Sequence, residues 1–277
     1  MSDAPARLVL DRPADARRAA ALLAAGTPVA HGFGAIYALT SRGDGVRRVN
    51  ALKGRPLDQT GSVTAPTGHV LDAFDLSALP STVPPSLVRD VVDAFSALGP
   101  FGFRGPAAGH VPADLTGRDG DLATTQVIVP GDACPSQTFL AAASAAVGGE
   151  PLAISSANRS RHVTGGLDAP VHWRVEGLRA ELGGADLVIL EHDDDAVARD
   201  RFPLHTTVST TILGLHRAER SRGRVHLVLE RHGSLHATAV VAVLRSMGLG
   251  LTISPRAATR LVARSYDLTG SSALAAL

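Results

Sequence analysis

The sequence predicts an α/β protein, in which helices and strands build one sheet, rather than a helical bundle or a β-sandwich. Two observations carry this prediction. Short apolar, β-branched runs alternate with helical patterns along the chain, and glycine and proline stand at the joints between them. No internal repeat, heptad pattern or low-complexity tract occurs, so solenoids, coiled coils and disordered tracts are not indicated.

The first half of the chain contains two clear helical patterns and one glycine-interrupted strand. Helical spacing of apolar residues predicts a helix that opens at Pro84-Pro85, and glycines interrupt a predicted strand at Gly32 and Gly34. The predicted elements are helices over residues 14–25, 43–52 and from 84, a strand over 28–39, a turn over 99–106 and an irregular loop over 105–120.

The second half alternates more regularly, and its apolar runs are short enough for buried strands. A polar turn, residues 156–160, directly follows one of these strands. The predicted strands are 124–129, 151–155, 186–190, 207–215 and 224–229, and the predicted helices are 137–147, 173–182 and 236–247. Patterning weakens after that, which predicts one domain over residues 1–248 and a C-terminal tail over 249–277.

Composition restricts the function classes. Hydrophobic residues make up 45% and charged residues 19%, with a formal net charge of +1, so the overall charge does not point to DNA or a membrane surface. Cys134 is the only cysteine, which excludes an internal disulfide and a cysteine zinc site. No targeting segment or membrane span is indicated, and a cytoplasmic location is expected.

Three polar elements stand where ligands bind in α/β sheets, beyond the ends of strands. They are Lys53-Gly-Arg55, the turn that contains Ser156 and Asn158, and Ser209-Thr-Thr. Lys53 is the only lysine in the chain, and a lysine suits a phosphate as a compact charge on a flexible stem. Together these groups supply the cations, hydroxyls and amides that a nucleotide needs.

In this order, the K-x-R and S-x-N elements resemble those of the YrdC-like L-threonylcarbamoyl-adenylate synthase family. Ser209-Thr-Thr and the Arg231-His-Gly turn are similar to two further elements of that family. The resemblance extends over roughly residues 29–247 and implies a twisted, mixed and parallel sheet flanked by helices, with a deep basic cleft.

The resemblance also implies an activity. Members of the family join L-threonine, bicarbonate and ATP into threonylcarbamoyl-AMP and pyrophosphate, and partner proteins then use the product to modify adenosine in tRNA. By this resemblance, the chain is expected to be a nucleotidyltransferase that uses ATP and Mg²⁺ and hands its product to a downstream acyltransferase. The residues implied for nucleotide binding are Lys53, Arg55, Ser156, Asn158, Ser209 and Arg231, of which Lys53 and Arg55 are the catalytic candidates.

The chain departs from the family where threonine is expected to bind. Gly32-Phe-Gly-Ala replaces a P-T-x-T string, Val63-Thr64 replaces V-H, and Ile128 stands where an arginine usually precedes a proline. Two interpretations remain open: an altered amine substrate, or threonine held by other side chains. The substrate-binding candidates are His31, Tyr37, Thr64 and Arg104.

Two other functions remain alternatives. Carbamoyltransferases contain YrdC-like modules and use carbamoyl phosphate to form carbamoyl-AMP, which would fit the loss of the threonine elements. A non-catalytic binder of nucleotide or RNA is the other alternative, with the arginines of residues 217–224 as phosphate contacts. The histidines lack metal-ligand spacing, so no metal site is predicted.

Overall fold

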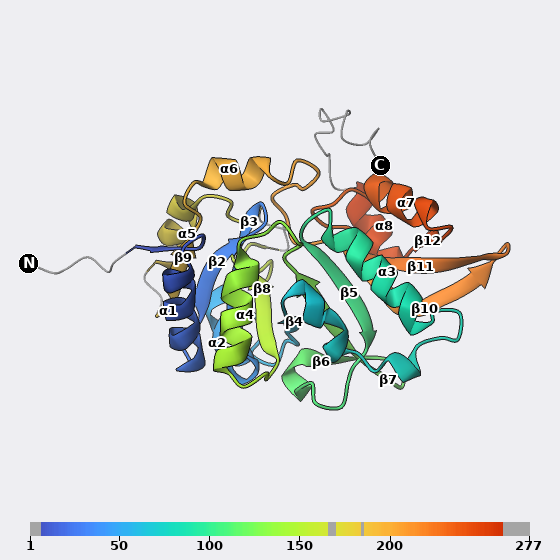
Figure 1. Cartoon of the computed structure of the whole chain (residues 1–277), viewed down its shortest axis with the longest axis horizontal. Helices are drawn as coiled ribbons and strands as arrows, with labels where there is room; N and C mark the ends of the chain where they lie inside the picture. Colours follow the sequence, from blue (N-terminus) through green and yellow to red (C-terminus); the bar gives the residue numbers. More distant parts are fainter. Residues whose placement is uncertain (1–6, 166–169, 184–185, 263–277) are drawn as a thin grey trace, which may run out of the picture.

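The computed structural model describes residues 7–165, 170–183 and 186–262 of the chain and contains one twelve-stranded mixed sheet (Figure 1). The strands are Leu8–Val9 (β1), Val29–Phe33 (β2), Ile36–Arg42 (β3), Ser62–Thr64 (β4), Phe101–Pro106 (β5), Thr116–Asp119 (β6), Leu122–Val129 (β7), Leu152–Ser156 (β8), Val188–Glu191 (β9), Ile212–Ser221 (β10), Arg224–Arg231 (β11) and Gly250–Ile253 (β12).

Eight α-helices flank the sheet in the described part of the chain. They are Pro13–Ala24 (α1), Val46–Lys53 (α2), Pro85–Ser96 (α3), Ser136–Ala146 (α4), Val175–Leu182 (α5), Asp195–Asp200 (α6), Ala237–Ser246 (α7) and Pro255–Val262 (α8). Short 3₁₀ helices occupy Gly43–Gly45, Thr67–Ala73, Leu76–Ala78 and Ala113–Leu115. No helix of these residues is long and apolar enough to cross a bilayer.

The strands lie in the order β1-β9-β2-β3-β8-β4-β7-β5-β10-β11-β12, and β6 pairs with β7 beside this path. The sheet contains both parallel pairs (such as β2 with β9, β4 with β7, and β5 with β10) and antiparallel pairs (such as β3 with β8 and β5 with β7). The predicted α/β sheet flanked by helices is therefore confirmed, and it is mixed.

Separate apolar clusters hold the helices onto the sheet. The largest joins α3 and α7 to the strands around β5, where the rings of Phe95 and Phe101 stack with centroids 4.2 Å apart. A second cluster packs α1 and α4 over the sheet, with Leu23, Phe139 and Leu140 fully buried. Burial of this apolar surface is the main contribution to stability.

Two segments differ from the sequence-based prediction in the first half. The predicted strand 28–39 is a hairpin, β2 and β3, whose tight connection includes Gly34 at φ +61°. A Cβ on Gly34 would lie 2.1 Å from Cγ of Pro100, so both the backbone angle and the packing require glycine. The interrupting glycine therefore marks a turn and not a bulge in one strand.

The prediction of a turn over residues 99–106 is wrong, because Phe101–Pro106 is β5, a central strand between β7 and β10. Its glycines reflect crowding within the sheet. A Cβ on Gly102 would lie 2.7 Å from Cδ1 of Ile128 and 2.9 Å from Cγ1 of Ile212. The predicted loop over 105–120 likewise contains a strand, β6, which pairs with β7.

The predicted domain boundary at residue 248 falls inside the sheet. Directly after it, β12 pairs in parallel with β11, from His226–Gly250 to Leu229–Ile253, and α8 packs against the same strand through Ala257. Of the predicted tail, residues 263–277 lie outside the described residues. The described part of the segment contributes a strand and a helix to the fold.

Candidate active site

A cleft of about 370 Å³ lies over the middle of the sheet, between β2, β3 and β8 on one side and β5, β10 and β11 on the other. Every charged side chain that lines it among the described residues is an arginine, and no Asp or Glu does. The lining arginines are Arg55, Arg104, Arg118, Arg231 and Arg256. Such a surface attracts anions, since the charged side chains that line it are cationic, although Arg104 among them has a carboxylate partner, Glu230.

Arg55 is placed in the cleft by the end of α2. The helix ends at Lys53, and Gly54 takes the left-handed conformation at φ +65°, so the chain turns between the two cations. The Arg55 side chain lines the cleft and makes no hydrogen bond or ion pair with another described residue. Burial lowers its pKa to about 10, so it stays charged at neutral pH. A partly buried cation without a counter-ion is suited to an anionic ligand.

Lys53 points away from the cleft, into the protein. Its side chain is fully buried, and Nζ donates to the carbonyl oxygens of Ser156 and Asn158 and lies 3.3 Å from Oδ1 of Asn158. Burial, and next the nearby Arg55 charge, hold the pKa of Lys53 well below its usual value. The lysine thus ties the turn after β8 to the end of α2, and it does not line the cleft.

Hydroxyls at the end of β8 and just before β10 line the cleft. Ser156 Oγ donates to Oδ1 of Asn158 over 2.7 Å and lies 3.5 Å from Oγ of Ser209, and both serines line the cleft. Asn158 lies behind them, 8% exposed, with its side-chain amide donating to the Arg159 carbonyl over 3.1 Å. The Oδ1 atom of Asn158 therefore orients the Ser156 hydroxyl, and Asn158 itself does not line the cleft.

Arg231, at the end of β11, is oriented by contacts with Thr210. Its Nε donates to the carbonyl of Thr210 over 2.7 Å, and a terminal nitrogen donates to Oγ1 of Thr210 over 2.9 Å. Gly233 lets the turn behind it press onto this segment, because a Cβ there would lie 2.3 Å from the carbonyl oxygen of Ser209. The contacts fix the guanidinium at the cleft wall.

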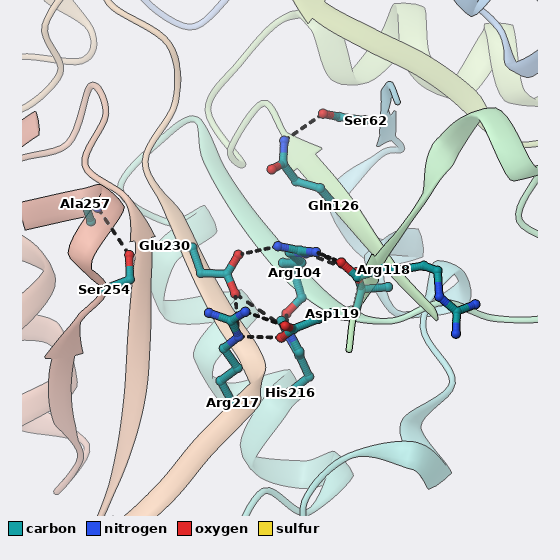
Figure 2. Close-up of polar contacts among 11 residues, drawn as sticks. Ser62, Arg104, Arg118, Asp119, Gln126, His216, Arg217, Glu230, Ser254 and Ala257 are labelled. Carbon is teal, nitrogen blue, oxygen red and sulfur yellow. Dashed lines mark hydrogen bonds and ion pairs between the residues drawn. The ribbon is translucent and has the colours of Figure 1, made fainter. Parts of the chain in front are cut away.

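Arg104 is held more tightly, and Figure 2 shows its surroundings. From β5, its guanidinium donates to Oγ1 of Thr124 over 2.9 and 3.1 Å and to Oε2 of Glu230 over 3.1 Å. Glu230 also faces Nε2 of His216 at 3.6 Å, and this histidine in turn contacts Asp119 at 2.9 Å. Multiple contacts from neighbouring strands give Arg104 little freedom, so its charge is preorganised toward the cleft.

The floor of the cleft differs chemically from its walls. Phe33, Ile36 and Ala38 from the β2–β3 hairpin and Ile128 and Ile154 from β7 and β8 line it. Phe33 and Ile128 lie in segments where this chain departs from the elements that are expected to bind threonine. The cleft thus combines an apolar floor with cationic walls.

Three of the substrate-binding candidates lie outside the cleft lining. The ring of His31 is fully buried, with Nε2 2.8 Å from Oγ1 of Thr40, and burial lowers its pKa to about 3. Tyr37 is also fully buried and donates to Oδ1 of Asp195 over 2.7 Å. Thr64 donates to the Ile128 carbonyl over 2.8 Å. Of the four candidates, Arg104 lines the cleft.

Sequence reasoning missed several polar lining residues. Arg118 lies on β6, in a segment predicted to be a loop, and Arg256 lies on α8, in the predicted tail. Gln126 donates to Oγ of Ser62 over 2.7 Å between β7 and β4 (Figure 2). The Ser254-Pro255 pair, a helix-start signal that Figure 2 shows as an N-cap to Ala257, could have identified α8.

Comparison with known proteins supports the fold. No protein-family model and no curated protein matches the sequence. Among solved structures, P. abyssi Sua5 complexed with L-threonine matches 92% of this chain at a TM-score of 0.60 and 18% identity. E. coli YciO matches 80% of this chain and 90% of its own, at a TM-score of 0.54 and 16% identity.

A full-length HypF in a phosphate- and nucleotide-bound form matches 79% of this chain at a TM-score of 0.53 and 16% identity, over 29% of its own length. The chain spans 62% of the length of the threonine-bound Sua5. At these identities the similarity shows the fold: the chain has the YrdC-like α/β fold of Sua5 and YciO, as predicted.

Proposed function

We propose that the cleft binds ATP and that the protein forms an adenylate, as the resemblance to threonylcarbamoyl-adenylate synthases implies. The observation that carries the proposal is Arg55, a partly buried guanidinium that lines the cleft and has no partner among the described residues. A polyphosphate would supply the missing negative charge. The nucleotide-bound HypF shares the fold, which supports a nucleotide as the ligand.

In the proposed reaction, an amine and bicarbonate form a carbamate with loss of water. A carbamate oxygen then attacks the α-phosphorus of ATP, the bond to the bridging oxygen breaks, and pyrophosphate leaves with the electron pair. Charge builds on pyrophosphate in this step, and fixed cations such as Arg55 and Arg231 can stabilise it. Ser156 and Ser209 add hydroxyls for phosphate or ribose.

We propose that Lys53 acts indirectly, by positioning these hydroxyls. Its Nζ holds the carbonyls of Ser156 and Asn158, so the lysine fixes the turn against α2 while Arg55 faces the ligand. The predicted pair of catalytic cations would then divide into one ligand-binding and one positioning residue.

The apolar residues of the cleft floor indicate what kind of side chain the amine substrate carries. Phe33, Ile36 and Ile128 offer apolar contacts and no charge, so we propose an amine whose side chain is more apolar than that of threonine. Sua5 is known in complex with L-threonine, which makes threonine the reference compound in any substrate panel.

A magnesium site formed by the protein does not fit the lining, because Mg²⁺ in proteins is usually bound by one or two carboxylates and none lines the cleft in the described part. No group of three His, Cys, Asp or Glu among the described residues could hold a metal ion. Mg²⁺ would enter as a chelate of the ATP phosphates.

Pyrophosphate release tests the proposal. The full chain is incubated with ATP, Mg²⁺ and bicarbonate and with threonine, valine, isoleucine or leucine as the amine. Amine-dependent release, fastest with an apolar amine and lost in Arg55→Met, is expected. Faster release with threonine would reject the altered substrate and keep adenylation, whereas silence with every amine and with carbamoyl phosphate would reject adenylation.

A carbamoyltransferase is the second candidate, favoured by the apolar floor and by the shared fold of HypF. Carbamoyl phosphate carries its own carbamoyl group and needs no amino-acid subsite. Pyrophosphate release that depends on carbamoyl phosphate, and not on bicarbonate with any amine, would select this reaction. In either case the adenylate product is labile, and we propose that a downstream acyltransferase consumes it, with RNA as the final acceptor.

A further inference from the structure

A cluster of charged side chains connects Arg104 to three other strands (Figure 2). Its members are Arg104 on β5, Asp119 on β6, His216 and Arg217 on β10 and Glu230 on β11, and we call these residues the charge cluster. Of its members, Arg104 lines the cleft. The others lie outside the lining, so they influence a ligand through Arg104 and through their electrostatic field.

His216 is the most enclosed member of the cluster, with a side chain that is 1% exposed. Its Nε2 atom lies 2.9 Å from Oδ2 of Asp119 and 3.6 Å from Oε1 of Glu230, and its Nδ1 atom lies 3.3 Å from the carbonyl oxygen of Arg104. Hydrogen bonds, chiefly from Arg217 and also from His216, hold the pKa of Asp119 well below its usual value. Carbonyl and carboxylate oxygens accept hydrogen bonds, and a neutral imidazole donates from one nitrogen alone. Both ring nitrogens face acceptors, so the geometry requires the imidazolium form of His216.

An irregular strand brings these groups together. His216 and Arg217 are consecutive, and consecutive side chains of a regular strand point to opposite faces, yet both contact Asp119. The pairing of β10 with β11 shifts register after Gly214, and such irregularities redirect side chains. Gly214 also leaves space for the second carboxylate, because a Cβ there would lie 2.7 Å from Oε1 of Glu230.

The charge balance of the cluster depends on one proton. With His216 protonated, three cations share two carboxylates, and without that proton two cations share them. The carboxylate of Glu230 lies between the cations, with Oε2 3.1 Å from Arg104 and Oε1 3.6 Å from Nε2 of His216. Charges at such distances in a partly buried site interact strongly. The proton on His216 therefore changes how far Glu230 neutralises Arg104.

We propose that His216 is a positioning residue for the cleft: its imidazolium shares the Glu230 carboxylate with Arg104 and so leaves more of the Arg104 charge to an anionic ligand. When His216 loses this proton, Glu230 neutralises Arg104 more completely, and one ring nitrogen turns a lone pair toward an oxygen atom. The affinity of the cleft for anions should therefore fall as His216 is deprotonated. The inference rests on the proposed anionic ligand of the cleft and not on adenylate formation.

The pH dependence of ligand binding tests the inference. Affinities for ATP and for inorganic pyrophosphate are measured by calorimetric titration between about pH 6.5 and 9, in the unchanged protein and in His216→Gln. At the lower pH the variant should bind both ligands about fivefold or more weakly, the lower end of the usual coupling between two sites. At the upper pH the two proteins should bind alike. Because the ligands also titrate, each ratio compares the two proteins at one pH.

His69→Gln is the matched control. His69 is exposed, contacts the carboxylate of Asp72 at 3.0 Å and lies outside the cleft lining. Its variant should follow the unchanged protein at every pH. A loss of affinity in His216→Gln that is the same at both ends of the pH range would show that the ring only supports the fold. That result would overturn the inference, as would the absence of any loss.

Nuclear magnetic resonance measures the protonation of His216 in the unchanged protein, without a ligand. Correlations between ring protons and ring nitrogens distinguish the imidazolium from both neutral tautomers. We expect protons on both nitrogens at about pH 6.5, and pyrophosphate should move the loss of one proton to higher pH, because coupling between two bound species is reciprocal. A neutral ring at this pH, or a titration that pyrophosphate leaves unchanged, overturns the inference even where His216→Gln does not fold.

The outcomes separate this inference from the proposed activity. ATP that binds with the expected pH dependence but releases no pyrophosphate rejects adenylate formation and keeps the role of His216. Amine-dependent pyrophosphate release with the same pH profile in His216→Gln and in the unchanged protein keeps the activity and rejects the role of His216.

Discussion

At the scale of single residues, two cations separated by one glycine have opposite environments. Lys53 is enclosed and hydrogen-bonded to two carbonyl groups, whereas Arg55 faces the cleft without a described partner. The K-x-R motif in the sequence predicts the same role for both charges. The left-handed Gly54 reverses the chain direction between them, which is why one is structural and the other is available to a ligand.

Arg55→Met and Lys53→Met should therefore separate binding from stability. Arg55→Met is expected to weaken ATP binding by about 10- to 100-fold, because charge-assisted hydrogen bonds contribute roughly 1.5–3 kcal/mol, while the melting temperature stays the same or rises. Lys53→Met should lower the melting temperature, because two buried carbonyls lose their donor. Calorimetric titration with ATP and thermal unfolding measure the two effects.

The reverse pattern would contradict this division of roles. If Arg55→Met unfolds the protein, Arg55 is a structural residue. If Lys53→Met abolishes ATP binding at an unchanged melting temperature, Lys53 is the direct phosphate ligand. Arg47→Met serves as the control, since Arg47 is exposed on α2 outside the cleft lining.

At the scale of elements, the central strand β5 shows how packing can override local signals. Residues 99–106 contain three glycines, two prolines and no β-branched residue, a composition that is typical of a turn. The segment is nevertheless paired on both sides, with β7 and β10. Gly102 allows neighbouring strands to bring Ile128 and Ile212 together over its backbone.

Gly102→Ala is expected to destabilise the protein by about 1–3 kcal/mol, the usual range for overpacking. The added methyl group would meet Ile128 at 2.7 Å and Ile212 at 2.9 Å, and Ile128 also lines the cleft. Urea denaturation measures the loss. Gly109→Ala is the control, because no atom lies within 4 Å of its Cβ position. Equal stability of the two variants would show that the sheet relaxes around residue 102.

At the scale of the whole molecule, buried histidines link stability to pH. Burial lowers the pKa of His31 to about 3 and that of His205 to about 4, against an unfolded value near 6.5. Below pH 6.5 the unfolded chain binds protons that the folded protein does not. The stabilising contribution of the two neutral, buried histidines is therefore fully present above pH 6.5. It is lost as the pH falls from 6.5 through the folded-state pKa values of about 4 and 3.

Between pH 7.5 and 5.5 we expect the free energy of unfolding to fall by about 2 to 3 kcal/mol, since each buried histidine contributes roughly 1.4 kcal/mol over this interval. Urea denaturation at both pH values measures the change. His205→Gln can keep the contacts to Ser234 and Leu98 and should remove about half of it. A pH-independent free energy of unfolding would mean that protonation of these rings is tolerated in the fold.

Local sequence patterns were enough to predict the class of fold, several of the helices and strands, and the polar elements that contribute to the cleft. Hydrophobic periodicity and glycine or proline boundaries are local properties, so α3, α4 and α7 and the strands β7, β8 and β11 were predicted to within a few residues. The polar elements that contain Arg55, Ser156, Ser209 and Arg231 were predicted to form a site, and all four line one cleft.

The direction in which each side chain of these elements points, and what surrounds it, depended on packing between distant parts of the chain. Lys53 and Asn158 turn inward, His31, Tyr37 and Thr64 are buried, and Arg118 and Arg256 enter the cleft from segments without a clear pattern. The reason is physical: the orientation of a side chain after a strand depends on one backbone angle and on what packs beside it. Those neighbours come from distant parts of the chain, and no local pattern in the sequence specifies them.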